Sequence, residues 1–166
     1  MDIKSKEKKN CLIVLKRKSN YSISLVRNFS NFYNVSIFFI HDRLNKNSKS
    51  IISEINSIIV DKNIELTLFE GDYISLINYD FIKSVDCQTK CLITLDDDDC
   101  HSFNLITGRD CDLILTTCPT SVQKYLNSGM NSHLFTLESS AEVFKDYRKG
   151  KNIDVLFFGR KSKYRQ

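Results

Sequence analysis

The feature that most constrains this chain is a regular alternation of short apolar runs with longer segments of helical periodicity. The apolar runs are rich in β-branched residues and nearly continuous, as expected of strands that are buried on both faces. This alternation is typical of a parallel sheet covered by helices. We predict six strands, at Cys11–Leu15, Val35–Ile40, Ile64–Phe69, Cys91–Leu95, Leu113–Thr116 and His133–Leu137.

The segments between these runs carry apolar residues three and four positions apart, which predicts helices. Asn20 or Ser22 is expected to cap a first helix, and Asn47 or Ser48 a second. Further helices are predicted at Tyr73–Ser84, near His101 and at Thr120–Asn127, with Pro119 near the start of the last and Gly129 just past its end. The apolar stripe of the first helix is Leu25, Val26, Phe29 and Phe32, and that of the second is Ile51, Ile52, Ile55, Ile58 and Ile59.

The composition fits one globular α/β domain, with 42% hydrophobic and 27% charged residues in a chain of 166. We predict a three-layer Rossmann-like domain with a mostly parallel sheet over residues 1–138. A polar segment at 139–152 reads as a linker, because a new apolar strand, Ile153–Phe158, follows it. Residues 153–166 would then begin a second lobe, and the unpaired strand could also serve in self-association.

Charge and cysteine content limit which partners and which cellular location we expect for this protein. The net charge of +4 comes partly from short clusters at the two ends, so we expect no nucleic-acid partner. The six cysteines contain no C-x-x-C pair and read as reduced thiols. No apolar run approaches the roughly 20 residues of a membrane span, and the first ten residues are charged. These features indicate a cytoplasmic protein, compatible with peripheral membrane contact.

Four consecutive carboxylates, Asp96–Asp99, follow directly after the buried run that ends at Leu95. Ligands of open α/β sheets bind beyond the carboxyl ends of the strands, which is where these acids are expected. His101 follows them, and a histidine within reach of a carboxylate can act as a base or anchor a hydroxyl. An equally open alternative is that the acids end the strand, cap the next helix and are otherwise solvated, with His101 structural.

Two further features could contribute to a site. Thr116 and Thr117 end the strand that begins at Leu113, although their hydroxyls could equally satisfy backbone groups. Gly159 and Arg160 end the last apolar run, where glycine lets a backbone approach a phosphate and arginine can bind a diphosphate.

Taken in order, these features resemble the CgeB-type family of GT-B glycosyltransferases. The matching motifs are an Asp-Asp pair with an aromatic residue shortly after it, a strand ending in two threonines before a helix, and Asp-Val-x-Phe-x-Gly before basic residues. They occur here as Asp98-Asp99 with His101 and Phe103, as Leu113–Thr117 with Tyr125 and Gly129, and as Asp154–Gly159 with Arg160–Arg165. The likeness covers about residues 92–165. Cys100 and Ser102 depart from the bulky residues typical of the family.

The resemblance implies two Rossmann-like lobes that face a cleft, with a nucleotide-sugar donor and a glycan-type acceptor as substrates. It implies neither a bound metal nor any other cofactor. Asp98, Asp99 and His101 would line the catalytic, acceptor side of the cleft with Phe103, and Thr116 and Thr117 its floor. Gly159 and Arg160 would approach the donor diphosphate. Because most of the donor lobe would lie beyond Gln166, we expect the chain by itself to be inactive.

Two other classes remain open. A GT-A-type glycosyltransferase would use Asp96–Asp99 to hold a divalent cation on the donor diphosphate, since hard cations take carboxylate ligands. A non-enzymatic, flavodoxin-like binding module would also carry acids at a strand end. A receiver-type version is disfavoured because the first strand ends in the basic run Lys16–Lys18.

Overall fold

A computed structural model describes residues 7–71, 77–95 and 97–136, apart from the side chains of Asn20 and Asp98. The strands are β1 Lys9–Leu15, β2 Tyr33–Phe39, β3 Leu66–Glu70, β4 Thr89–Thr94, β5 Leu113–Thr116 and β6 Ser132–Leu134. The α-helices are α1 Asn20–Ser30, α2 Ser48–Asp61, α3 Tyr79–Lys83, α4 Asp97–Thr107 and α5 Pro119–Asn127. Two 3-10 turns, η1 Ile40–Arg43 and η2 Gly108–Asp110, complete the described elements.

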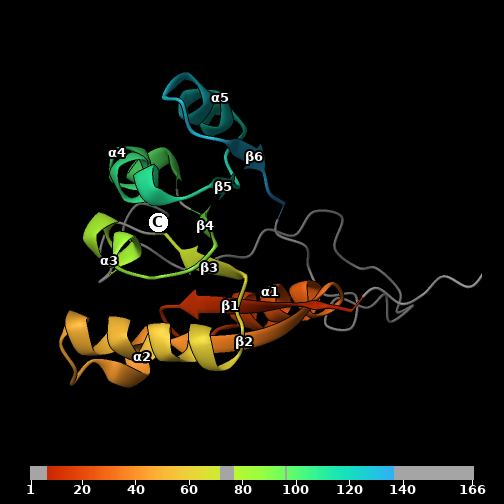
Figure 1. The fold of residues 1–166 in the computed structure, drawn as a ribbon. Helices are drawn as coiled ribbons and strands as arrows, with labels where there is room; N and C mark the ends of the chain where they lie inside the picture. Colours follow the sequence, from red (N-terminus) through yellow and green to blue (C-terminus); the bar gives the residue numbers. More distant parts are fainter. Residues whose placement is uncertain (1–6, 72–76, 96, 137–166) are drawn as a thin grey trace, which may run out of the picture.

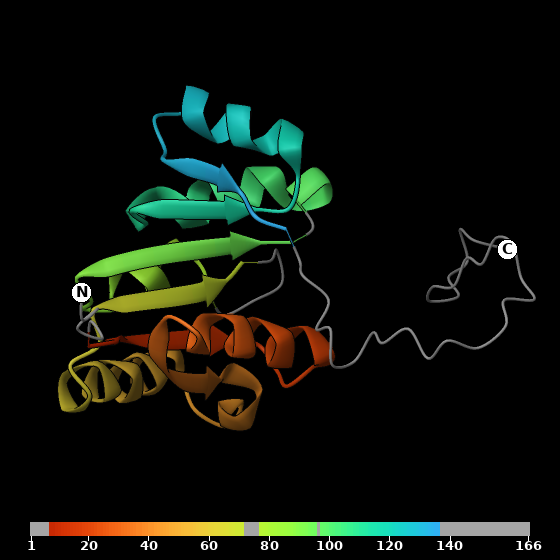
Figure 2. The same ribbon diagram turned by 90° about the vertical axis from the view of Figure 1, so that its right-hand side faces the viewer.

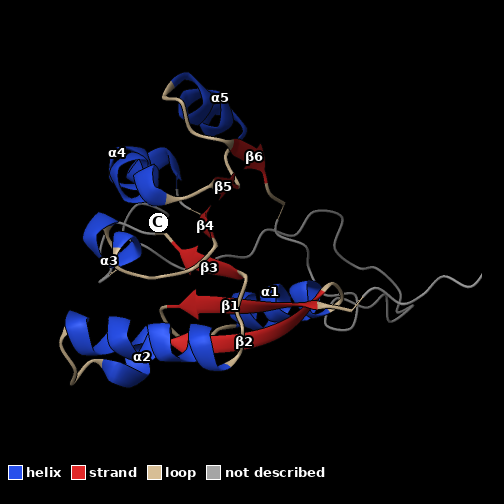
Figure 3. Cartoon of the chain, viewed as in Figure 1, coloured by secondary structure: helices blue, strands red, loops and turns tan. Residues whose placement is uncertain are grey.

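The strands form one six-stranded sheet in the order β2-β1-β3-β4-β5-β6, and every neighbouring pair is parallel. Helices lie on both faces of this sheet, which confirms the predicted three-layer Rossmann-like domain (Figures 1 and 3). The connection from β1 to β2 runs across the sheet in the direction opposite to the later ones. Consequently α1 lies on one face, while α2, α3 and α4 lie on the other.

Each face of the sheet carries its own apolar core, because successive side chains of a strand point to opposite sides. Leu12 and Val14 of β1 face the helices α2 and α3 and join the larger cluster. Cys11, Ile13 and Leu15 face α1 and join the smaller one, which includes Leu25 of that helix. All five of these β1 residues are 0% exposed, so β1 is the most deeply buried strand that the structure describes.

Helix caps explain where two of the helices begin. Asn47 caps α2, as predicted, by accepting a hydrogen bond from the backbone of Ser50 at 2.9 Å. The cap of α1 is Ser19, so the predicted caps, Asn20 and Ser22, were wrong. Ser19 and Ser22 form a capping box in which each side chain accepts from the other's backbone N–H, at 3.1 and 2.7 Å.

The structure corrects three further expectations. The helix predicted near His101 begins earlier, at Asp97, because acidic residues are favourable in the first turn of a helix. Within the described part of the predicted helix Tyr73–Ser84, α3 spans only Tyr79–Lys83, since Asn78 caps it by accepting from the backbone of Phe81. Phe32 lies beyond the end of α1 and is 74% exposed, so it does not belong to the buried stripe.

The predicted linker at 139–152 and the strand Ile153–Phe158 lie outside the described residues. Among the described helices, none has the length and apolar character needed to cross a membrane.

Candidate functional site

The carboxyl ends of β4 and β5 lie side by side, and α4 and α5 begin immediately after them. Every neighbouring pair of strands is parallel, so the strands end at the same edge of the sheet, and α4 and α5 cover the β4–β6 end of it (Figure 2). Thr94 ends β4 and Thr116 ends β5, and the two residues are paired in the sheet register. Their side chains face the start of α4, where polar groups from four elements meet.

Asp97 is the centre of this polar cluster, although it is only 1% exposed. Its Oδ2 atom accepts hydrogen bonds from Thr94 Oγ1 at 3.0 Å and Thr116 Oγ1 at 2.6 Å. Its Oδ1 atom accepts from Asn104 Nδ2 at 3.0 Å and Tyr125 OH at 2.6 Å. One carboxylate therefore ties together β4, β5, α4 and α5.

These four donors keep Asp97 ionised despite its burial. Burial alone would raise the pKa of the carboxyl, because it disfavours the charged form. The hydrogen bonds from Thr116, Tyr125, Asn104 and Thr94 outweigh that effect and lower the pKa below its ordinary value. Burial and the bond to Asp97 both raise the pKa of Tyr125, so its hydroxyl stays protonated and acts as a donor. The cluster thus holds a fixed negative charge below the protein surface.

His101 lies next to this charge, one helical turn after Asp97. Its Nδ1 atom is 3.7 Å from Asp97 Oδ1, a contact too long for a hydrogen bond, and is buried without a hydrogen-bond partner. The imidazole also packs against the ring of Tyr125, with centroids 4.7 Å apart. Because 19% of the side chain is exposed while Nδ1 is buried, solvent reaches another part of this side chain. His101 thus connects the buried carboxylate with the surface.

The other predicted site residues are distributed around this cluster. Asp99 is exposed on the first turn of α4, and Phe103 is half-buried on the same helix. Thr116 is 0% exposed and belongs to the cluster through its hydrogen bond to Asp97. Thr117 lies near it, but its hydroxyl donates to the backbone oxygen of Leu95 at 2.8 Å, which matches the structural alternative considered for that residue. The Asp98 side chain and the whole of Gly159 and Arg160 lie outside the described residues.

The sequence analysis considered Asp97 only as one of the four acids Asp96–Asp99 and Tyr125 only as part of a helix motif, and it did not consider Asn104. A helix started at Asp97 would have placed Asp97, His101 and Asn104 at positions i, i+4 and i+7, which lie on one helical face. The predicted start near His101 concealed this spacing. Nothing local in the sequence indicates that Tyr125, on another helix, completes the set.

The donor arrangement around Asp97 also bears on metal binding. An ionised carboxylate offers about four lone-pair sites, and four donors already occupy those of Asp97. It therefore has no lone pair left for a cation in this arrangement. Across the described ranges, no group of three or more His, Cys, Asp or Glu side chains is placed to hold a metal ion.

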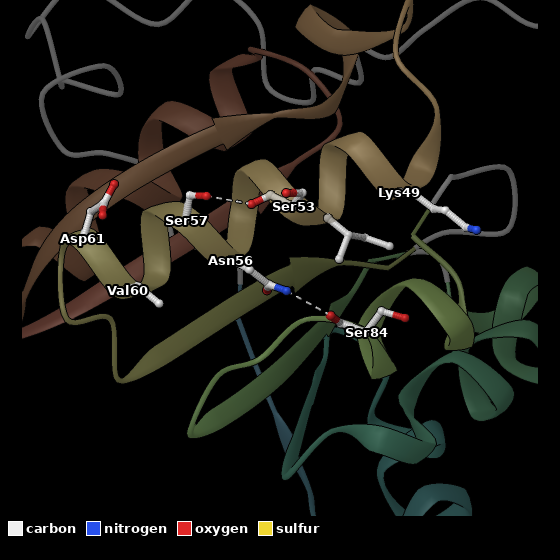
Figure 4. A pocket seen from close by; sticks show the side chains of 8 residues that line it. Lys49, Ser53, Asn56, Ser57, Val60, Asp61 and Ser84 are labelled. Atoms are coloured by element: carbon white, nitrogen blue, oxygen red, sulfur yellow. Dashed lines mark hydrogen bonds between the residues drawn. The ribbon is translucent and has the colours of Figure 1, made fainter.

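A groove lies elsewhere on the surface, along the outer side of α2 (Figure 4). This open groove of about 660 Å³ runs between Lys49 and Asp61 and is bordered by Ser84. Asn56 crosses it by donating to the backbone oxygen of Ser84 at 3.2 Å and accepting from the backbone of Asp86 at 2.9 Å. These bonds fasten α2 to the segment after α3, so the polar side chain of Asn56 in the groove has a structural role.

The cluster at the ends of β4 and β5 is therefore the candidate site, since it combines a buried charge, a partly exposed histidine and the ligand-binding edge of the sheet. Comparison of the chain with family models, curated proteins and solved structures finds no match in any of the three.

Proposed function

We propose that this domain is the acceptor-binding lobe of a glycosyltransferase of the GT-B type, with His101 as the catalytic base. The observation that carries the proposal is the ionised, buried Asp97 beside the partly exposed imidazole, at the carboxyl ends of β4 and β5. The motif order Asp98-Asp99, Thr116-Thr117 and Asp154–Gly159 supports the same assignment.

The chemistry asked of His101 is the removal of a proton from an acceptor hydroxyl. The imidazole takes this proton as the hydroxyl oxygen forms a bond to the anomeric carbon of the donor sugar. The bond from that carbon to the nucleoside diphosphate breaks, and its electron pair leaves on the phosphate oxygen. The positive charge gained by His101 is stabilised by the fixed negative charge of Asp97, which costs little reorganisation because the carboxylate is already held in place.

The remaining roles follow from position. Asp99 and Phe103 lie four residues apart on α4, two positions before and two after His101, and are assigned to the acceptor, because a carboxylate can bind sugar hydroxyls and a ring can pack against an apolar sugar face. Thr116 acts indirectly, by donating a hydrogen bond to Asp97. Gly159 and Arg160 are assigned to the donor diphosphate, where positive charge stabilises the leaving group. Asp98 is assigned to the acceptor side with Asp99.

A flavodoxin-like binding module is the second candidate, and the strand order favours it in one respect. The first five strands follow the order β2-β1-β3-β4-β5, which is that of flavodoxin-like folds. Such folds bind ligands at the switch point between β1 and β3, two strands away from His101. The location of the bound ligand therefore separates the two candidates.

The test is a titration of the 166-residue chain with a panel of neutral disaccharides and, separately, with uridine and guanosine diphosphate sugars, followed by amide NMR. We expect a disaccharide to shift the amide resonances of Asp99, His101, Phe103 and Thr117. The His101→Gln variant should weaken this binding about fivefold or more, as expected for the loss of about one hydrogen bond. Shifts confined to the β1 and β3 ends would favour the flavodoxin-like module instead.

His41→Gln is the matched control, because His41 is an exposed histidine in η1, just after β2. It should bind the disaccharide as the wild-type protein does. The proposal fails if no disaccharide in the panel binds, or if His101→Gln binds as tightly as His41→Gln.

A further inference from the structure

The two oxygens of Asp97 each receive two hydrogen bonds, and this leaves His101 without one. Oδ2 accepts from Thr94 and Thr116, on the side away from the imidazole. Oδ1, the oxygen nearest to His101, accepts from Asn104 and Tyr125 at 3.0 and 2.6 Å. A carboxylate oxygen has about two lone-pair sites. Both sites of Oδ1 are therefore occupied before His101 Nδ1, at 3.7 Å, can use either.

Tyr125 makes the shorter of the two bonds to Oδ1 and is the residue that also contacts the imidazole. Its ring lies 4.7 Å from that of His101 between centroids, with the planes tilted by 50°. The side chain is 0% exposed, and its backbone belongs to α5, so the ring has little freedom to move. One residue thus controls both the access of His101 to the carboxylate and the placement of the imidazole.

The charge of Asp97 determines which nitrogen of a neutral His101 carries the proton. An ionised carboxylate can only accept hydrogen bonds, so a lone pair on Nδ1 facing Oδ1 would be repelled. A proton on Nδ1 is attracted to the same oxygen. The proton therefore belongs on Nδ1, and Nε2 keeps a lone pair with which to accept a proton from a substrate.

We propose that Tyr125 is a positioning residue for His101: it occupies the Asp97 lone pair that Nδ1 would otherwise take, while its ring holds the imidazole in place. His101 then rests with its proton on Nδ1, facing the carboxylate without a hydrogen bond. When Nε2 accepts a proton, the positively charged ring is attracted to the same carboxylate. This inference rests on the proposed role of His101 as a base, but it concerns the resting protein and can be tested without substrate.

The test is NMR of the histidine side chains in the 166-residue chain, labelled with ¹⁵N, comparing the wild type with Tyr125→Phe and Thr94→Val. Tyr125→Phe keeps the ring and removes the hydroxyl, which frees one lone pair of Oδ1. Thr94→Val is the control, because it removes one hydrogen bond to Asp97 from Oδ2, the far oxygen, at 3.0 Å against 2.6 Å for the bond from Tyr125 to Oδ1.

In the wild type we expect the neutral His101 ring to be protonated on Nδ1, with no strongly downfield N–H proton. In Tyr125→Phe a downfield, slowly exchanging Nδ1–H resonance should appear, since Nδ1 then donates to Asp97. Thr94→Val should lack this resonance. If Tyr125 had a purely structural role, removal of its hydroxyl would change none of these features.

Two results would overturn the inference. One is a neutral wild-type ring protonated on Nε2, which can be observed even if the Tyr125→Phe variant does not fold. The other is a folded Tyr125→Phe variant without the new resonance. If the spectra agree with the expectation but His101→Gln still binds disaccharides like the wild type, the role of His101 as a base fails and the positioning by Tyr125 stands.

Discussion

At the scale of single residues, Asp97 decides how the end of the sheet is organised. Four donors from β4, β5, α4 and α5 converge on its carboxylate, and all four donor residues are 0–1% exposed. Burying a charge is unfavourable unless hydrogen bonds satisfy it. Because the four bonds do so, the same carboxylate stabilises the fold and provides the charge on which the proposed function depends.

The stabilisation by Asp97 should depend on pH in a defined direction. Its folded pKa is lowered, so its contribution is complete above the unfolded value of about 3.9 and is lost as the pH falls through the folded pKa. In Asp97→Asn an NH2 group replaces one carboxylate oxygen, so the two donors to that oxygen lose their acceptor. Each loss should cost about 1–3 kcal/mol of stability. Urea unfolding at a series of pH values should show a large difference from the wild type at pH 7 that shrinks in acid.

Asp99→Asn is the control, since Asp99 is exposed on the same turn of α4. It should change the free energy of unfolding by no more than about 0.5 kcal/mol and follow the wild type at every pH. A constant difference between Asp97→Asn and the wild type across the acid range would contradict the assignment.

The sequence led to the right edge of the sheet but not to the central residue. The run Asp96–Asp99 and the pair Thr116-Thr117 were recognised because strand ends are local features of a sequence. Which of several adjacent carboxylates turns inward depends on the helical phase of α4 and on a hydroxyl from α5. That phase is set by tertiary contacts such as the bond from Tyr125 to Asp97, which no local pattern reveals.

At the scale of elements, the strands were predictable and the helix ends less so. All six predicted strands are present, and Leu113–Thr116 has the predicted bounds. β1 also ends at Leu15 as predicted, whereas β6 ends at Leu134, three residues before the predicted end. The remaining strand ends shift by one or two residues, because apolar runs and backbone pairing need not end together. The start of a helix depends on one or two polar residues. Several such residues stand side by side near Ser19 and near Asp97, so the cap of α1 and the start of α4 were predicted at the wrong residues.

Two glycines at helix ends are needed for different reasons. At Gly108 in η2, an added Cβ would lie 2.7 Å from Ile114 Cδ1 in the core. At Gly129, after α5, nothing lies within 4 Å, but the backbone has a φ of +78°. Gly108→Ala should cost about 1–3 kcal/mol through crowding. Gly129→Ala should cost about 1–2 kcal/mol through backbone strain.

A double-mutant cycle separates these causes. Ile114→Val removes Cδ1, so in urea unfolding it should recover part of the cost of Gly108→Ala and none of the cost of Gly129→Ala. Equal coupling of Ile114→Val to both glycine variants would refute the crowding explanation.

At the scale of the whole molecule, the described residues build both faces of a three-layer domain. The two apolar clusters draw their buried members from residues 11–125, on β1 to β5 and the helices around them. β6 adds the last strand, and just after it the backbone of Phe135 donates to Thr116 at 2.7 Å. Phe135 also packs against the smaller cluster. The contacts that define the domain therefore extend to Phe135.

A chain shortened after Glu138 should accordingly fold by itself. We expect its urea unfolding transition to match that of the 166-residue chain in midpoint and slope, since the slope reports the surface exposed on unfolding. A chain shortened after Asn131 is the comparison, because it also loses β6 and Phe135. Its midpoint should fall clearly, with part of β5 left as an unpaired edge. If the chain ending at Glu138 were destabilised as much as the one ending at Asn131, the predicted domain boundary near residue 138 would be wrong, and later residues would belong to this domain's core.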